Sequence, residues 1–197
     1  MGFVHCVVTV TVGMTGSAVL FAAPVMATGP DPAVVSVADS RLSGPGVDLS
    51  VTIPTGWHQI PNQADPSLLQ MVYPNTCSEQ LTCASAMARV VSTQAASAQA
   101  EAQAAEQAIT GQPGLSGATL TSEAPTQIAG RTGYQVRFSF SNAKAKFQAA
   151  AVAVETGPAS SGTVPTSLIF VTVSDLPGAP PASVIDEIVG SAQVPAK

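Results

Sequence analysis

Hydrophobic and polar residues alternate along two stretches of this chain. In residues 47–53 and again in residues 134–140, a large apolar side chain occupies every second position, with polar residues between. A period of two is typical of a strand that buries one face. The pattern therefore predicts strands at 47–53 and 134–140, and a turn around Asn142 joins the second to a partner strand at 147–154 as an antiparallel hairpin.

Shorter apolar runs predict four further strands, at 68–73, 84–91, 118–128 and 168–173. The run 168–173 has little polar interruption, which is typical of a strand buried on both faces. We expect it to lie in the middle of its sheet.

Two segments predict helices instead. Residues 93–110 are mostly Ala and Gln, which favour helix, and Gly111 and Pro113 provide a stop signal. Because the apolar face of this helix is mostly alanine, we expect it to approach a sheet closely and to help form a ligand cleft there. Residues 182–189 place their apolar side chains on one helical face, and Gly190 is expected to cap that helix.

The order of these elements predicts an α+β fold, an antiparallel sheet packed with helices. One domain is expected, at 47–197, because the roughly 170 residues after position 27 suit a single core. Residues 28–46 mix Pro, Gly and Ala with polar residues and are predicted to be a flexible leader.

Residues 1–27 are predicted to be a secretory signal peptide. They contain no charged residue, run apolar from Phe3, and end with Val25 and Ala27 at the small-residue positions before a cleavage site. The expected location is therefore secreted, in the cell envelope outside the cytoplasm. The positive residue usual near the start is missing, and a misassigned start codon would explain this. The alternative is a retained segment, since about twenty apolar residues can span a bilayer and would tether the protein to a membrane.

Removal of the signal would take away Cys6 and leave an even pair of cysteines. In an oxidising exported setting, Cys77 and Cys83 are predicted to form a disulfide. No metal site is predicted, because a zinc site needs more ligands than the two cysteines supply. With seven basic and twelve acidic residues, the chain carries a net charge of -5, which argues against nucleic acid as a partner.

Two neighbouring residues are candidates for a functional site. Trp57 could line a ligand groove, although a single Trp after a strand is more often part of the core. His58 is the one histidine after the signal segment, so a hydrolase with a His base would have to use it. The acidic residues are scattered and offer no paired acid and base. We therefore predict no catalytic residues and no cofactor.

Several features together resemble a known family. They are Ile53-Pro54-Thr55-Gly56-Trp57 after the first strand, a helix after the third strand, Gly133-Tyr134 at the start of the hairpin, and the closing helix over 184–194. With them the chain resembles exported actinobacterial, in particular mycobacterial, proteins of the LpqN/LpqT type, which have a PsbP-like (Mog-type) α/β/α sandwich. The likeness covers about 47–194.

The resemblance implies this fold and an accessory or binding role in the cell envelope, with no catalytic residues to carry over. The chain differs from the lipoprotein members because Cys6 does not stand in a lipidation context, so no lipid anchor is expected. We predict a non-enzymatic envelope protein that binds an apolar ligand, such as an envelope lipid, or a partner protein. The alternatives are an interaction module that pairs through an edge strand, and a hydrolase that uses His58.

Overall fold

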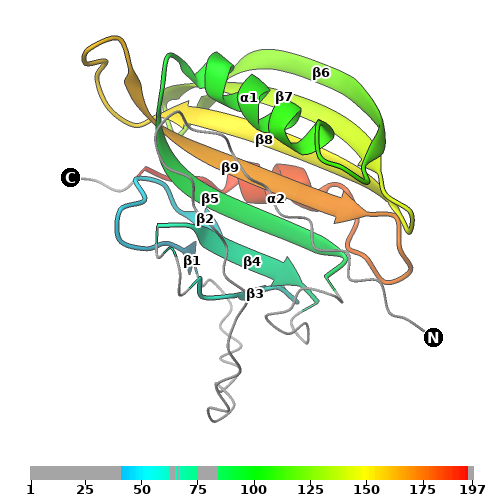
Figure 1. Ribbon diagram of the computed structural model, residues 1–197. Coiled ribbons are helices and arrows are strands. Elements are labelled where there is room, and N and C mark those ends of the chain that lie inside the picture. Colours follow the sequence, from blue (N-terminus) through cyan, green and yellow to red (C-terminus); the bar gives the residue numbers. More distant parts are fainter. Residues whose placement is uncertain (1–40, 63–64, 66, 75–83, 195–197) are drawn as a thin grey trace.

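In the computed structural model, the described residues are 41–62, 65, 67–74 and 84–194. They form a helix, sheet and helix arrangement in three layers, with α1 on one face of a seven-stranded antiparallel sheet and α2 on the other (Figure 1). The predicted α+β fold is confirmed. The signal segment 1–27, Cys77 and Cys83 lie outside the described residues, so the cleavage and the disulfide stay predictions.

The sheet order is β3-β4-β5-β9-β8-β7-β6. The elements in chain order are β1 (Arg41–Leu42), β2 (Val51–Thr52), β3 (His58–Gln59), β4 (Leu69–Tyr73), β5 (Ala86–Ala95), α1 (Ala98–Thr110), β6 (Ser116–Ile128), β7 (Arg131–Ser141), β8 (Lys146–Glu155), β9 (Val164–Ser174) and α2 (Val184–Gly190). No helix within these ranges is both long and apolar enough to cross a membrane.

Strands β4 to β9 lie where the apolar runs predicted them. The continuous run 168–173 belongs to β9, which occupies the middle position of the sheet as expected. At the β7–β8 hairpin, Asn142 Oδ1 accepts hydrogen bonds from the backbone N–H groups of Lys144 and Ala145, at 2.8 and 2.9 Å. The side chain thus replaces backbone partners in the turn, which is why Asn suits this position.

The strand predicted at 47–53 is much shorter in the structure. Only Val51–Thr52 is a strand, and it pairs with β1 in a separate two-stranded sheet. The alternation is nevertheless real, since Val47, Leu49 and Val51 are all buried. They pack in the same core cluster as α2, so burial on one face did not require pairing in the main sheet.

The folded part also begins before the predicted boundary at residue 47. Arg41 and Leu42 form β1, and the Leu42 side chain is completely buried. The Arg41 guanidinium donates to the backbone carbonyls of Ser50 and Ser191, both at 2.9 Å. These contacts join residues 41 and 42, which were expected in the leader, to the domain.

The first helix begins five residues later than predicted. Residues 93–95 continue β5, where they pair with the start of β9, and the helix begins at Ala98 after the N-cap Ser97. Ser97 Oγ accepts a hydrogen bond from the Ala100 N–H at 3.1 Å. Tertiary pairing therefore outweighs local helix propensity in this segment. The closing helix extends to Gly190, and Ser191 rather than Gly190 is its C-cap.

Two hydrophobic cores lie on opposite faces of the sheet. Beneath α1, Ala98, Ala102, Ala105 and Ile109 pack with the alanines of β8 and with four phenylalanines from β7, β8 and β9. On the other face, α2 contributes Val184, Ile185, Ile188 and Val189 to a core that includes Trp57 and Leu49. Alternating positions of β8 and β9 supply both cores, as expected for a central strand pair.

Candidate functional site

Trp57 belongs to the core and not to a ligand groove. Its side chain is 6% exposed, and its ring centroid lies 6.1 Å from that of Tyr73. The turn before it requires glycine, because Gly56 has a φ of +82° and a Cβ there would lie 2.9 Å from Tyr73 Cε2. Among the described residues, Trp57 therefore has the structural role that a single Trp after a strand usually has.

The cleft expected between the Ala-rich helix and the sheet is filled. Ala102 of α1 is fully buried, as are Ala151 and Ala153 of β8 in the same cluster. The rings of Phe138 and Phe170 occupy the remaining space, with centroids 6.3 Å apart. Small side chains on both surfaces let helix and sheet meet closely, which is the reason the expectation of a cleft there was wrong.

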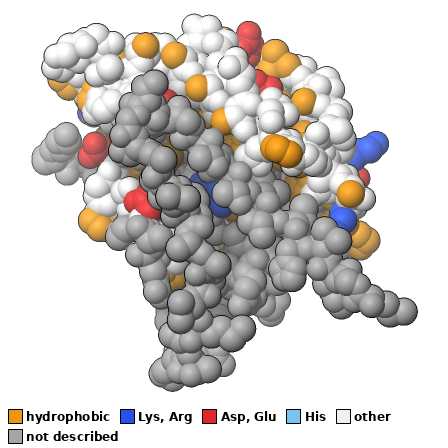
Figure 2. Space-filling model, in the orientation of Figure 1, with side chains coloured by type: hydrophobic (Ala, Val, Ile, Leu, Met, Phe, Trp, Pro, Cys, Tyr) orange, Lys and Arg blue, Asp and Glu red, His pale blue; other side chains and the backbone are white. Residues whose placement is uncertain are grey.

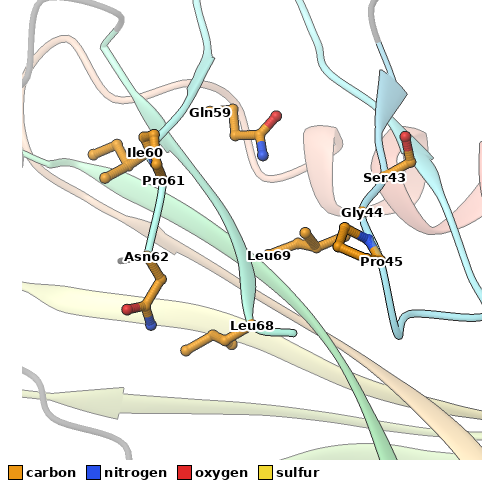
Figure 3. Close-up of a pocket in the computed structure, with 9 residues that line it drawn as sticks. All are labelled: Ser43, Gly44, Pro45, Gln59, Ile60, Pro61, Asn62, Leu68 and Leu69. Carbon is orange, nitrogen blue, oxygen red and sulfur yellow. The ribbon is translucent and has the colours of Figure 1, made fainter. Parts of the chain in front are cut away.

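A small pocket lies elsewhere, at the edge of the sheet beside β3 and β4 (Figure 3). Its volume is about 180 Å³, and neither Trp57 nor His58 lines it. The lining residues are Ser43, Gly44, Pro45, Gln59, Ile60, Pro61, Asn62, Leu68 and Leu69. It has no charged wall, and drug-sized ligands usually occupy about 300 Å³ or more.

A different surface becomes visible from the register of the strands. Phe170 and Leu168 of β9 face α1, and Cα partners across an antiparallel pair share a face. Following the pairing from β9 through β5 and β4 to β3, the α1 side of these four strands carries a set that we name the Arg89 face: His58, Gln70, Val72, Met87, Arg89 and Thr172. Val72 and Met87 form a hydrophobic cluster with Ile60.

In the described part of the chain, no helix lies over the Arg89 face. Helix α1 lies over the other half of the sheet, where it packs with β7, β8 and β9 (Figure 1). Where side chains on the α1 side of the molecule are drawn in colour, charged ones occur at a few scattered places (Figure 2). The same face of one sheet is thus closed by a helix in one half and has no described helix in the other.

Arg89 is the chemically unusual member of this face. Its Nε donates a hydrogen bond to Gln70 Oε1 at 2.8 Å, across the β4–β5 pair. Burial lowers the pKa of the guanidinium to about 10. A lowered pKa means that the surroundings oppose the positive charge, as expected where no carboxylate compensates it.

Two other arginines of the described chain have stronger polar partners than Arg89. The Arg41 guanidinium donates to two backbone carbonyls and to two hydroxyls, and Arg137 forms an ion pair with Asp186. Arg89 has one neutral amide oxygen, and within the described ranges no acidic side chain forms an ion pair with it. The Arg89 face therefore combines buried apolar side chains with a cation that has no acidic partner within the described ranges.

His58 lies on the Arg89 face, on the short strand β3. Its Nδ1 is buried, and no described residue supplies a hydrogen-bond partner for it. A catalytic histidine is normally oriented by a carboxylate and hydrogen-bonded to its nucleophile, and neither contact occurs among the described residues. The described ranges also hold no group of three or more His, Cys, Asp or Glu side chains that could bind a metal ion.

A second buried charge lies under α1. Glu101 is 7% exposed and its Oε1 has no hydrogen-bond partner in the described structure. Burial raises the pKa of this carboxyl, and the nearby Thr93 hydroxyl opposes the rise only in part. Glu101 is thus one of the residues that α1 buries.

Sequence reasoning missed Arg89 although one signal was present. The residue interrupts the apolar and small residues of 84–91, where every other side chain could be buried at little cost. A charged residue inside such a run indicates a partner or a function, because burying an unpaired charge is unfavourable. Its pairing with Gln70 could not be found without the strand register.

Comparisons with known proteins find solved structures that are similar to this chain at low sequence identity. No family model matches the chain, and no curated protein matches its sequence. The chain is similar to a protein of Bacteroides thetaiotaomicron VPI-5482, with 13% identity and a TM-score of 0.45 over 79% of this chain, and it spans about half (48%) of that chain.

Two further solved structures are similar to it over most of their length. One is the cyanobacterial PsbP (CyanoP) of Synechocystis sp. PCC 6803, with 14% identity and a TM-score of 0.48 over 84% of this chain and 98% of that one. The other is LpqN of Mycobacterium tuberculosis, described as involved in cell envelope biogenesis, with 14% identity and a TM-score of 0.48 over 79% of this chain and 90% of that one.

Proposed function

We propose that this chain is a non-enzymatic accessory protein of the cell envelope that binds an apolar ligand, such as an envelope lipid, on the Arg89 face. The observation that carries the proposal is Arg89 itself, a guanidinium set among apolar side chains without an acidic partner in the described chain. The envelope location follows from the predicted signal segment and from the family resemblance of the sequence. The same face could instead receive a partner protein.

Two other places in the described structure are less suited to such a ligand. The interface beneath α1 is filled by alanines and phenylalanines. The pocket beside Leu69 is small and uncharged. The Arg89 face places a polar anchor beside apolar side chains, which is the combination that ligand sites generally use. Because Ile60, Val72 and Met87 are only 7%, 0% and 9% exposed, a ligand would bind there only after the face opens.

The test is a binding screen of envelope lipid extracts with the exported protein. Displacement of a fluorescent acyl probe is a better readout than intrinsic fluorescence, because Trp57 lies in the core on the other face of the sheet. The screen is run with the unaltered protein and with the control variant Arg137→Met, which removes one positive charge from a residue whose partner, Asp186, belongs to α2. We expect lipids of the extracts to displace the probe saturably from both proteins. Absence of displacement across all extracts would overturn the ligand proposal.

An interaction module is the second candidate, and strand β6 favours it. β6 is a thirteen-residue edge strand, exposed along most of its length, and Leu120 is 53% exposed. Such an edge can accept a strand from another protein. Two features of β6 count against pairing along its whole edge. The register shifts at 116–119 and 120–122, and Pro125 lies within the strand. Both features are typical of edges that resist pairing.

Crosslinking in culture filtrate distinguishes the two candidates. A second proline at Thr119 or Ala124 should abolish capture of a partner that pairs with β6, whereas Arg89→Met should not affect it. Recovery of the protein alone would count against the interaction module. A hydrolytic role of His58 is a third candidate, and activity that survives His58→Ala would exclude that residue as its base.

A further inference from the structure

We infer that residues 28–40 of this chain cover the Arg89 face, with the side chains of Val35 and Val37 packed on the cluster of Ile60, Val72 and Met87. Such a cover closes the face whether or not a ligand ever displaces it, and so goes beyond the proposed function. The burial of the face, the place where residues 28–40 join the domain and their sequence support it.

The Arg89 face is buried although no described helix lies over it. Gln70, Val72 and Met87 are each less than a tenth exposed. At the other end of the sheet, Leu120 is the Cα partner of Phe138 and lies on the same α1 side, yet it is 53% exposed. Side chains stand roughly perpendicular to a sheet, so their outer ends stay in water unless something packs on them. The burial of the Arg89 face therefore requires a cover, and neither helix in the described ranges supplies it.

Residues 28–40 join the domain close to this face. They are followed by Arg41, the first residue of β1. Just after β1, a Cβ at Gly44 would lie 2.6 Å from Leu69 Cδ2, so the chain here runs beside β4, on the α2 side to which Leu69 belongs. In the described sheet, only the two-residue strand β3 lies between β4 and the edge. The segment thus starts one short strand away from the edge that leads to the Arg89 face.

The segment is also long enough to pass round that edge. Strands lie about 5 Å apart and packed layers about 10 Å apart, so the way from the α2 side of β4 to its α1 side is about 15–20 Å. Val37 and Val35 lie four and six residues before Arg41. An extended chain of these lengths spans about 13 and 20 Å. Val37 would therefore reach Ile60 beside the edge strand, and Val35 would lie further in, over Val72 and Met87.

The sequence of residues 28–40 suits an apolar cover of this kind. Its large apolar side chains are the valines at 34, 35 and 37, and valine favours an extended chain. In an extended chain, Val35 and Val37 lie on the same side. Both charged residues of the segment are acidic, so it brings no positive charge towards Arg89.

The other segments outside the described ranges are less suited to cover the face. Residues 75–83 contain one large apolar residue, Leu81, and residues 63, 64 and 66 are Gln, Ala and Pro. Residues 1–27 are strongly apolar, but they are predicted to be removed on export. In the exported chain, the valines of residues 28–40 are the largest apolar group that remains outside the described ranges.

The two methionines after residue 27 provide an assay for the cover. Met87 lies on the Arg89 face, and Met71 is fully buried in the core on the α2 side. Hydrogen peroxide oxidises accessible methionine to the sulfoxide, and peptide mass spectrometry gives the rate at each position. In the unaltered exported chain both should react slowly. The double variant Val35→Ser, Val37→Ser should speed oxidation of Met87 about tenfold or more and leave Met71 unchanged, because burial of even one valine is worth a factor of this size in an equilibrium.

Two further variants serve as controls. Ala33→Ser, Ala38→Ser introduces the same two serines in place of small side chains and should leave both rates unchanged. An unchanged rate at Met87 in the valine variant would overturn the inference. Faster oxidation of Met87 in Leu81→Ser but not in the valine variant would overturn it too, because the cover would then be residues 75–83.

A crosslink tests the contact directly and keeps the test valid where the valine variant loosens the whole domain and exposes both methionines. Benzoylphenylalanine placed at position 35 should form, on illumination, a crosslink within one chain to the peptide that contains Val72 or Met87. Crosslinks only to peptides of the α2 side, or only between two chains, would overturn the inference.

Discussion

The burial of Arg89 has a cost that can be measured. Burial lowers its pKa to about 10, well below the ordinary value of a guanidinium, and a decrease of this size corresponds to about 3 kcal/mol. Because the folded pKa lies below the unfolded one, the folded state resists the proton, and the stability cost is fully present below pH 10. It decreases only as the pH rises above 10, towards the ordinary pKa of a guanidinium. At neutral pH the folded protein is therefore destabilised by its own arginine.

Replacing Arg89 by Met should consequently stabilise the fold. Met keeps the length of an apolar side chain and removes the charge, but Gln70 Oε1 then loses its donor, which costs about 1–3 kcal/mol for a buried amide oxygen. The expected net gain is about 1 kcal/mol in the free energy of unfolding. In the double variant Arg89→Met, Gln70→Met, the unpaired amide is removed too, and the gain should approach about 3 kcal/mol.

The assay is urea unfolding at pH 7, followed by far-ultraviolet circular dichroism. Arg137→Met is the control, and we expect a loss of no more than about 1 kcal/mol, the usual value of a surface ion pair. Equal slopes of free energy against urea would show that the unfolded states are comparable. If Arg89→Met lowers the free energy of unfolding by more than about 1 kcal/mol, the guanidinium is paired within the chain, and the reasoning about an unpaired cation is refuted.

Three further predictions concern the other parts of the fold. The free energy of unfolding should fall as the pH rises from about 4.5 through the raised pKa of Glu101, since the folded state retains that proton. Glu101→Gln should remove this fall. Urea titrations of the unaltered protein that give the same free energy at every pH from 4 to 7 would contradict the prediction. Ala102→Leu should cost about 1–3 kcal/mol and lower the melting temperature, because Ala102 is fully buried against the sheet; an unchanged melting temperature would show room under α1. Gly133→Ala should destabilise the fold by a similar amount, since its Cβ would lie 2.9 Å from the Ala153 carbonyl oxygen. A Cβ at Gly190 in α2 meets no atom within 4 Å, so Gly190→Ala should stabilise the fold by about 0.5–1 kcal/mol. A higher melting temperature for Gly133→Ala than for Gly190→Ala would exclude this account.

Much of the fold was predictable because its signals are local. Apolar runs predicted β4 to β9, the central place of β9 and the hairpin at Asn142. The errors lie where tertiary contacts decide. Residues 93–95 have helix-forming neighbours yet pair with β9, and Val47 to Val51 alternate because they pack beside α2 and not because they join the main sheet.

The candidate site was less predictable. Trp57 and His58 attracted attention as rare residues, and the structure places Trp57 in the core and His58 without a catalytic partner among the described residues. Arg89 was overlooked because a single charge in a strand has no meaning until its neighbours are known. The site depends on which strands are adjacent and in what register, and one sequence carries no direct record of either.

The residue pattern alone determined the α+β fold class. Periodicity, helix propensity and turn residues act over a few positions and need no knowledge of the rest of the chain. The order of the sheet, the burial of Leu42 and the filled interface beneath α1 were decided only when distant segments packed together. The setting of Arg89 belongs with these. Its charge is written in the chain, but the amide that orients it and the apolar side chain of Val72 come from another strand, Gln70 being nineteen residues away.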